Sequence, residues 1–264
     1  MGDSLPYVRV NGIRVAYRFD GKEGAPVVTL SHGLLADYRM WDPQVDALAA
    51  RFRVLRYDIR GHGASDAPDG PYSFEVLDAD LVALLDALEI ARTHFLGHSI
   101  GGMIGQRFAA CHPGRIGRLI LAGTSATTPV ASAWEGWLDT IRRGGMQGLV
   151  ESMLDRWFDD AFRAAHPEEV ARVADAVRAS PAAGFVGSAH TIMALDHMPL
   201  LPRIKAPTLI IVGAETRSAS VADGEAMRQA IPNARMIVLP NARHFANIEQ
   251  TAAFNRALLD FLGS

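Results

Sequence analysis

Cysteine is nearly absent from this chain, which has 264 residues and a single cysteine, Cys111. One cysteine cannot form an intramolecular disulfide, and it excludes a zinc site built from four thiolates. An excess of positive charge is also missing, since the formal net charge is -3 at pH 7. Proteins that bind nucleic acids usually present a basic face, so we expect no nucleic-acid partner.

Long apolar runs are missing as well. No stretch approaches the ~20 residues of a membrane span, and the first residues, Met-Gly-Asp-Ser-Leu-Pro, lack the basic and apolar parts of a signal peptide. We therefore expect a cytoplasmic protein with no membrane partner. The length allows one large domain or two small ones, and a chain of this size buries enough apolar surface to need no disulfide or metal.

Short apolar segments rich in β-branched residues recur along the chain and predict strands. The first two are separated by Asn11-Gly12, a pair that favours the tight turn of a hairpin. Most of the others are apolar on both faces, as strands covered by helices on both sides tend to be. The predicted strands are Val8–Val10, Arg14–Phe19, Val27–Ser31, Val54–Tyr57, Thr93–Gly97, Leu119–Ala122, Thr208–Val212 and Met236–Leu239.

Helical patterns alternate with these strands. Apolar residues recur at helical spacing in Phe74–Leu88, Ile100–Ala110 and Thr251–Leu262. Such alternation predicts an α/β fold with a mostly parallel, eight-stranded sheet and helices on both faces.

Residues 124–202 break the alternation, because they contain helical patterns and no convincing strand. The clearest helices are Trp134–Arg143, Gly148–Phe158 and Glu168–Ala179. We interpret the segment as a helical lid inserted after strand 6, over the sheet end where ligands bind. The α/β core is then formed by residues 1–123 and 203–264.

The strongest chemical motif is Gly97-His98-Ser99-Ile100-Gly101, which directly follows a predicted strand and opens a predicted helix. In that context G-x-S-x-G is typical of a nucleophile elbow, a tight turn that exposes the serine oxygen at the head of a helix. The helix N-terminus also brings N–H groups and a positive dipole end near developing negative charge. Ser99 is therefore the predicted nucleophile.

Two further loops at the carboxyl ends of strands complete the predicted site. The turn Ser31-His32-Gly33-Leu34-Leu35 can aim the Leu34 N–H at the point faced by the Ile100 N–H, and together they would form an oxyanion hole. The loop 239–245 carries His244, the predicted general base, between the last strand and the last helix. The other eight histidines are less suitable because of where they lie. They occupy turns (His32, His62 and His98), the start of a strand core (His94), or positions in or near helical stretches (His112, His166, His190 and His197).

These motifs resemble the α/β-hydrolase superfamily, and within it the 3-oxoadipate enol-lactonases. The resemblance rests on residues 57–66 (Tyr-Asp-Ile-Arg-Gly-His-Gly-Ala-Ser-Asp), the elbow, Ala242-Arg243-His244 with Asn247-Ile248-Glu249, and Arg156-Trp157-Phe158. It covers nearly the whole chain. It implies an α/β-hydrolase fold and an acyl-enzyme on the serine that water then hydrolyses, with histidine shuttling the proton and no cofactor. It also implies a small-molecule substrate with an ester or lactone bond, such as an enol-lactone.

The chain departs from the superfamily at the third catalytic residue, usually an Asp three residues after the glycine that ends strand seven. Here Gly213 is followed by Ala-Glu-Thr, so Thr216 occupies that position. Loss of the acid costs ~10⁴-fold in other triad enzymes. Glu215 is one candidate substitute, and Asp223 is another if the loop is rebuilt. Otherwise Ser99 and His244 act alone, in a weak hydrolase, in a cofactor-free lyase or isomerase, or in a ligand-binding module with little turnover.

Large side chains of the predicted lid are candidates for the substrate pocket. We expect Trp134 to contact the substrate, whereas helical spacing does not separate pocket from core for Trp137, Met146, Met153 and Trp157. Arg142-Arg143 would suit a substrate carboxylate, although a solvated helix face explains the pair more simply. The sequence predicts neither the substrate's identity nor the oligomeric state.

Overall fold

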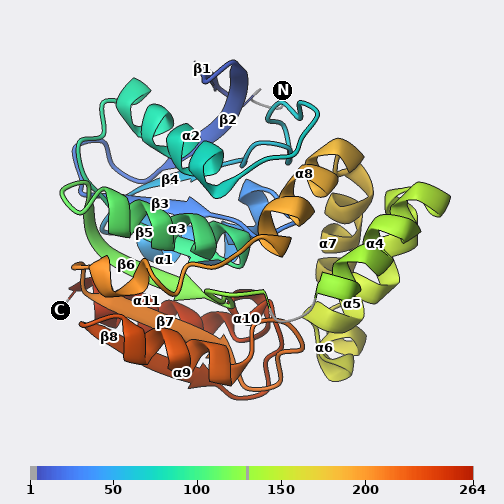
Figure 1. The fold of residues 1–264 in the computed structure, drawn as a ribbon. Coiled ribbons are helices and arrows are strands. Elements are labelled where there is room, and N and C mark those ends of the chain that lie inside the picture. The colour runs from blue at the N-terminus through green and yellow to red at the C-terminus, as the bar shows by residue number, and fades with distance from the viewer. Residues whose placement is uncertain (1–4, 129–130, 264) are drawn as a thin grey trace.

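The eight predicted strands form a single sheet in a computed structural model of the protein, which describes residues 5–128 and 131–263 (Figure 1). The first residues, on which the targeting prediction rests, lie partly outside this range. The strand order is β1-β2-β4-β3-β5-β6-β7-β8, and only the pairs β1–β2 and β2–β4 are antiparallel. The strands are β1 (Tyr7–Val10), β2 (Ile13–Asp20), β3 (Val27–Ser31), β4 (Arg53–Tyr57), β5 (Thr93–His98), β6 (Ile116–Ala122), β7 (Thr208–Gly213) and β8 (Ala234–Leu239).

Asn11 and Gly12 form the predicted hairpin turn. Both have positive φ angles, 45° and 79°, as a two-residue turn between right-twisted strands requires. The pairing of Val10 with Ile13 closes the hairpin directly at the turn.

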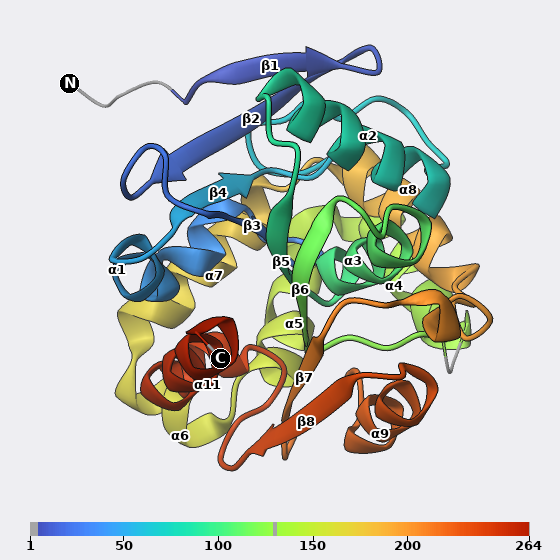
Figure 2. The same cartoon turned by 90° about the vertical axis from the view of Figure 1, so that its left-hand side faces the viewer.

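Helices cover both faces of the sheet, as predicted (Figure 2). The three helices expected in the core are present as α2 (Phe74–Ala87), α3 (Ile100–Cys111) and α11 (Thr251–Gly263). The sequence analysis missed α1 (Asp42–Ala49), α9 (Val221–Ala230) and the short α10 (Ala246–Glu249). These three are short, and each buries at most three side chains, so their helical stripe is faint.

The core lies on both sides of the sheet, and this explains why the strand β7 is apolar on both of its faces. All its residues are buried. Leu209 and Ile211 join an apolar cluster with α1 and α11, while Ile210 and Val212 join another with α2 and α3. The edge strand β8 differs from this expectation, because its Ile237 and Val238 are exposed.

A helical insertion, α4 to α8, runs between β6 and β7 and lies beside one end of the sheet (Figure 1). Three of its helices match the predicted ones, and α6 and α8 were missed. The pattern of α8 is obscured because glycine, alanine and serine are buried around most of its surface. No helix in the described part of the chain is long and apolar enough to cross a membrane. The insertion consists of α4 (Ala131–Gly144), α5 (Val150–Trp157), α6 (Asp160–Ala165), α7 (Pro167–Ala179) and α8 (Ala182–Met193), with a 3₁₀ turn at Met146–Leu149.

Candidate active site

Ser99 occupies a strained turn between β5 and α3. Its φ and ψ angles are 51° and −118°, a combination that non-glycine residues rarely adopt and that occurs mainly at functional sites. Neighbouring backbone leaves no room for side chains on either side of the turn. A Cβ on Gly97 would lie 2.3 Å from the Gly101 carbonyl oxygen, and one on Gly101 would lie 2.3 Å from the Ser31 carbonyl oxygen. The elbow geometry thus follows from the glycines of the motif.

The two predicted oxyanion-hole residues lie beside Ser99. Ile100 is the first residue of α3, where a backbone N–H has no partner within the helix. The turn after β3 packs against the elbow, since a Cβ on Gly33 would lie 3.6 Å from the Cβ of Ser99. Leu34, the next residue, lines the same cavity as Ser99. This placement agrees with an oxyanion hole, and the role itself stays a prediction.

His244 lies in the loop between β8 and α10 and lines the cavity together with Ser99. Only 6% of its surface is exposed. Burial lowers its pKa well below 6.5, and the nearby His98 and Arg156 lower it further. The imidazole is therefore neutral at pH 7, the state in which it can accept a proton from a serine hydroxyl.

His98 ties the elbow to the loop of His244. Its Nε2 donates a hydrogen bond of 2.9 Å to the His244 carbonyl oxygen, and the two ring centroids are 4.5 Å apart. Burial lowers the pKa of His98 to about 4, so this ring is neutral as well. His98 thus fixes the distance between the two predicted catalytic residues.

Among the described residues, no carboxylate forms a hydrogen bond with the imidazole of His244. Its buried Nδ1 has no hydrogen-bond partner among the described residues. The structure thereby corrects the expectation for Glu215, whose N–H donates to the Ala242 carbonyl and whose side chain is exposed. Asp223 does not replace it, because its carboxylate accepts the N–H and hydroxyl of Ser220 in a capping box at the start of α9. The hydroxyl of Thr216 accepts only the N–H of Ser218.

The cavity in front of Ser99 and His244 has a volume of about 380 Å³, a size typical of sites for small molecules. It lies between the carboxyl ends of the strands and the helical insertion. Trp134 lines it, and its contact with a substrate stays a prediction. Trp157 and Met153 are both packed in the core and part of the cavity wall. The large apolar lining residues are Leu34, Met103, Trp134, Trp137, Met153, Trp157 and Ile192.

Arg156 supplies a positive charge in this cavity that the sequence analysis did not assign. Its Nη2 donates to the Arg217 carbonyl, and its guanidinium lies 5.1 Å from the Trp137 ring centroid. It forms no ion pair with a carboxylate in the described part of the chain. The arginines that sequence suggested, Arg142 and Arg143, are exposed, and Arg142 pairs with Asp139. The motif Arg156-Trp157-Phe158 marked this arginine in the sequence, but it did not indicate that the side chain points into the cavity.

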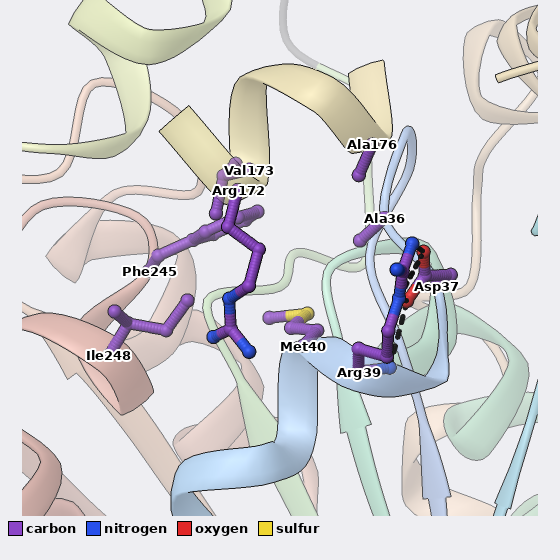
Figure 3. A pocket seen from close by; sticks show the side chains of 9 residues that line it. All are labelled: Ala36, Asp37, Arg39, Met40, Arg172, Val173, Ala176, Phe245 and Ile248. Carbon is purple, nitrogen blue, oxygen red and sulfur yellow. Dashed lines mark hydrogen bonds and ion pairs between the residues drawn. The ribbon is translucent and has the colours of Figure 1, made fainter. Parts of the chain in front are cut away.

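A second, smaller cavity is lined by α7, the turn at residues 36–40 and Phe245, the residue after His244 (Figure 3). Its volume of about 30 Å³ holds no more than a water molecule or two. Both of its arginines have carboxylate partners, since Arg39 pairs with Asp37 and Arg172 with Asp42 and Glu169. This cavity therefore offers no free charge to a ligand.

Comparisons with known proteins identify the family of this fold. Residues 26–251 match the family model of the alpha/beta hydrolase fold. The chain is 34% identical over 246 residues to the 3-oxoadipate enol-lactonase 2 of Acinetobacter baylyi, covering 93% of this chain and 92% of that one. It is 30% identical to a putative carbamate hydrolase of Variovorax paradoxus, covering 93% and 95%.

A solved structure, the enol-lactonase from Burkholderia xenovorans LB400, superposes with a TM-score of 0.96 at 41% identity, covering 98% of this chain and all of that one. The resemblance to enol-lactonases and the predicted fold are thereby confirmed. The chain belongs to the α/β-hydrolase fold family, among its ester and lactone hydrolases.

Proposed function

We propose that the protein hydrolyses an ester or lactone bond of a small organic molecule through an acyl-enzyme on Ser99. The observation that carries this proposal is the shared cavity, which brings a serine on a strained elbow and a neutral, buried histidine to one space. The serine oxygen attacks the carbonyl carbon and its proton passes to Nε2 of His244. The same nitrogen then gives the proton to the leaving oxygen, and water attacks the acyl-enzyme.

The negative oxygen of the tetrahedral intermediate would be held by the N–H groups of Leu34 and Ile100. One such donor is worth roughly 10²–10³-fold in turnover. The dipole of α3, whose first residue is Ile100, acts in the same direction. The chemistry needs no metal or cofactor, because the serine, the histidine and the backbone supply every group it uses.

Arg156 indicates the substrate class. It is half-buried and forms no ion pair with a carboxylate of the described residues, and such a cation is costly until an anion pairs with it. We propose an ester or lactone that also carries a carboxylate, of which an enol-lactone is one example. Two relatives are named 3-oxoadipate enol-lactonases, which supports this choice. The helical insertion contributes Arg156, Trp134 and Trp137 to the cavity wall, so we further propose that it acts as a lid.

A fluorophosphonate probe and p-nitrophenyl acetate test the nucleophile. The parent protein should release p-nitrophenol and take up one phosphonyl group on Ser99, identified by peptide mass spectrometry. Ser99→Ala should lose both reactions. Ser125→Ala is the matched control, because this serine lines the same cavity and should react as the parent does. A parent protein that is inert toward both reagents contradicts the proposal.

Substrate charge is tested with two p-nitrophenyl esters of similar length, the hydrogen glutarate and the hexanoate. Arg156→Gln should raise KM for the glutarate about tenfold or more, which corresponds to ~1.4 kcal/mol, and leave the hexanoate nearly unchanged. Arg142→Gln removes an exposed arginine of the insertion and should change neither. Equal effects of Arg156→Gln on both esters would refute the carboxylate assignment.

The unpartnered Nδ1 of His244 favours a second candidate, a cofactor-free lyase or isomerase that uses the oxyanion hole on an enolate. Such an enzyme would need Ser99 only as a hydrogen-bond donor. Its Ser99→Cys variant would keep part of its turnover without forming an acyl-enzyme. A ligand-binding module, the third alternative, would bind its ligand equally well in Ser99→Ala and show no turnover in either form.

A further inference from the structure

The loop that carries His244 is bound to the helical insertion through main-chain contacts. The Phe245 N–H donates to the Trp157 carbonyl at 3.2 Å, where α5 ends. The rings of the same two residues stack with centroids 4.7 Å apart and an interplanar angle of 12°. The residue directly after the predicted base is therefore fixed to the end of α5.

Arg243, the residue before the base, is bound to the same end of α5. Its side chain is buried, and Nη1 donates to the carbonyl oxygens of Asp155 and Phe158, both at 2.7 Å. Carboxylates of the insertion lie farther away, with Asp155 at 3.5 Å and Asp160 at 3.7 Å from this nitrogen. The arginine thus serves to cap α5 rather than to bind a ligand.

One carboxylate bridges the two segments. Oε2 of Glu249 accepts the Arg243 N–H at 2.6 Å, and Oε1 accepts the Asp159 N–H at 2.8 Å. Glu249 closes α10, directly after the base loop, and Asp159 is the N-cap of α6. The same side chain therefore holds the backbone next to His244 and the backbone of the insertion.

We propose that Glu249 is a positioning residue for His244. Its ionised carboxylate holds the loop of His244 against the helical insertion and so orients the imidazole, a task that a triad acid performs through a hydrogen bond to Nδ1. The inference rests on the proposed function, because it concerns the same base. A triad acid orients the imidazole and stabilises its charge. Glu249 contacts no ring atom, so it supplies only the orientation.

We call the two hydrogen bonds of Glu249, to the N–H groups of Arg243 and Asp159, the Glu249 clamp. The clamp depends on pH because the charged form of Glu249 is the better acceptor for two N–H groups. Burial raises its pKa to about 7; the two N–H donors and the charge of Arg243 lower it, while the charge of Asp159 raises it. The other ionisable groups near this junction are Asp155 and Asp160, whose carboxylates face Arg243. His98 and Arg156 are the charged or titratable groups that act on His244. The carboxylate is thus largely protonated at pH 6, whereas His244 remains neutral there.

Glu249→Gln tests the clamp, because the amide keeps the shape and removes the titration. The rate of Ser99 labelling by the fluorophosphonate and kcat/KM for p-nitrophenyl acetate are followed from pH 5 to 9. In the parent both should fall below pH 7 with an apparent pKa near that of Glu249. In Glu249→Gln the values at pH 8 should be roughly 10–100-fold lower, through kcat rather than KM, and the limb near pH 7 should vanish.

A second pair of variants removes only the partner N–H. Asp159 has φ −72°, and Phe158 before it is extended, so proline fits at position 159 without strain and deletes the donor. Asp159→Ala is the matched control: it loses the same N-cap side chain but keeps the N–H. Asp159→Pro should lower kcat/KM about tenfold relative to Asp159→Ala, with urea unfolding showing that both fold.

The outcomes separate this inference from the proposed function. A parent that never labels at Ser99 refutes the proposed function. A parent that labels, with a pH 7 limb unchanged in Glu249→Gln and equal rates in the two Asp159 variants, refutes the clamp alone. If Glu249→Gln does not fold, the Asp159 pair still decides, since a difference between proline and alanine supports the clamp and equality overturns it.

Discussion

Thr216→Asp should restore the missing acid. Glu215 donates its N–H to the Ala242 carbonyl, so residue 216 follows a residue already bonded to the base loop, two positions before His244. In other triad enzymes, replacing the acid by an amide lowers turnover ~10⁴-fold, about 5.5 kcal/mol. Thr216 is only half-buried, and a carboxylate there would also accept the Ser218 N–H, as the threonine hydroxyl does now. Hydration and this competing bond reduce the gain, so we expect about 10²-fold, or ~2.7 kcal/mol.

The assay compares kcat for p-nitrophenyl acetate in the parent, Thr216→Asp and Thr216→Asn across pH 5 to 9. Asparagine has the same shape without the charge, so only the aspartate should accelerate the reaction. The pKa of His244, now well below 6.5, should rise toward its ordinary value because a nearby negative charge favours the imidazolium. Equal rates for the aspartate and asparagine variants would refute the idea that Nδ1 lacks a useful partner.

Three stability measurements by urea unfolding probe the framework around the site. Gly213→Ala places a Cβ 2.1 Å from the Arg243 carbonyl oxygen, and should cost about 1–3 kcal/mol together with most of the esterase activity; a stable, active variant would show that this loop yields easily. Asp80→Asn leaves Arg60 buried without its carboxylate and should lower the free energy of unfolding by ~3–5 kcal/mol. Asp66→Asn, at an exposed ion pair, should lower it by under ~1 kcal/mol. Equal losses in the two variants would contradict the role of burial. The free energy of unfolding should also fall as the pH is lowered from 6.5 to 4, because five buried histidines with lowered pKa values bind fewer protons in the folded than in the unfolded state. Two carboxyls whose pKa values are raised to about 7 act in the opposite direction. Stability that rises toward pH 5 would mean that the two carboxyls dominate. The histidines are His32, His62, His98, His197 and His244, and the carboxyls are Asp58 and Glu249.

The strands and the elbow were predictable from sequence because their signals are local. Alternation within a strand and a glycine two residues on either side of Ser99 depend on neighbours in the chain. The position of His244 in the cavity of Ser99 was predictable for a related reason, since the loop after the last strand has to lie at the carboxyl end of the sheet. Each prediction used backbone periodicity or strand order and no knowledge of distant side chains.

The acid and the cavity wall were not predictable in the same way. Whether Glu215 points to His244 depends on how its loop after β7 bonds to Ala242 in the loop after β8, a contact between segments far apart in the sequence. Arg156 faces the cavity rather than solvent because α5 packs against the base loop, which sequence spacing does not encode. Arg142 is an arginine of the same insertion, and it is exposed because of where α4 lies. Long-range packing, not residue type, separates these two arginines.

The position of the helical insertion has a consequence for how the chain folds. The strands of the pairs β3–β4 and β5–β6 are each linked by a single helical crossover, but β7 pairs with β6 only after residues 123–207 have been closed into a loop. Each doubling of loop length adds about 0.6 kcal/mol of closure entropy, and such non-local pairing slows folding. The contact of His98 with His244 spans 146 positions and depends on this late step. A nascent chain that still lacks β7 and β8 therefore carries the elbow without His244, so the proposed reaction should start only once the C-terminal part of the sheet has joined.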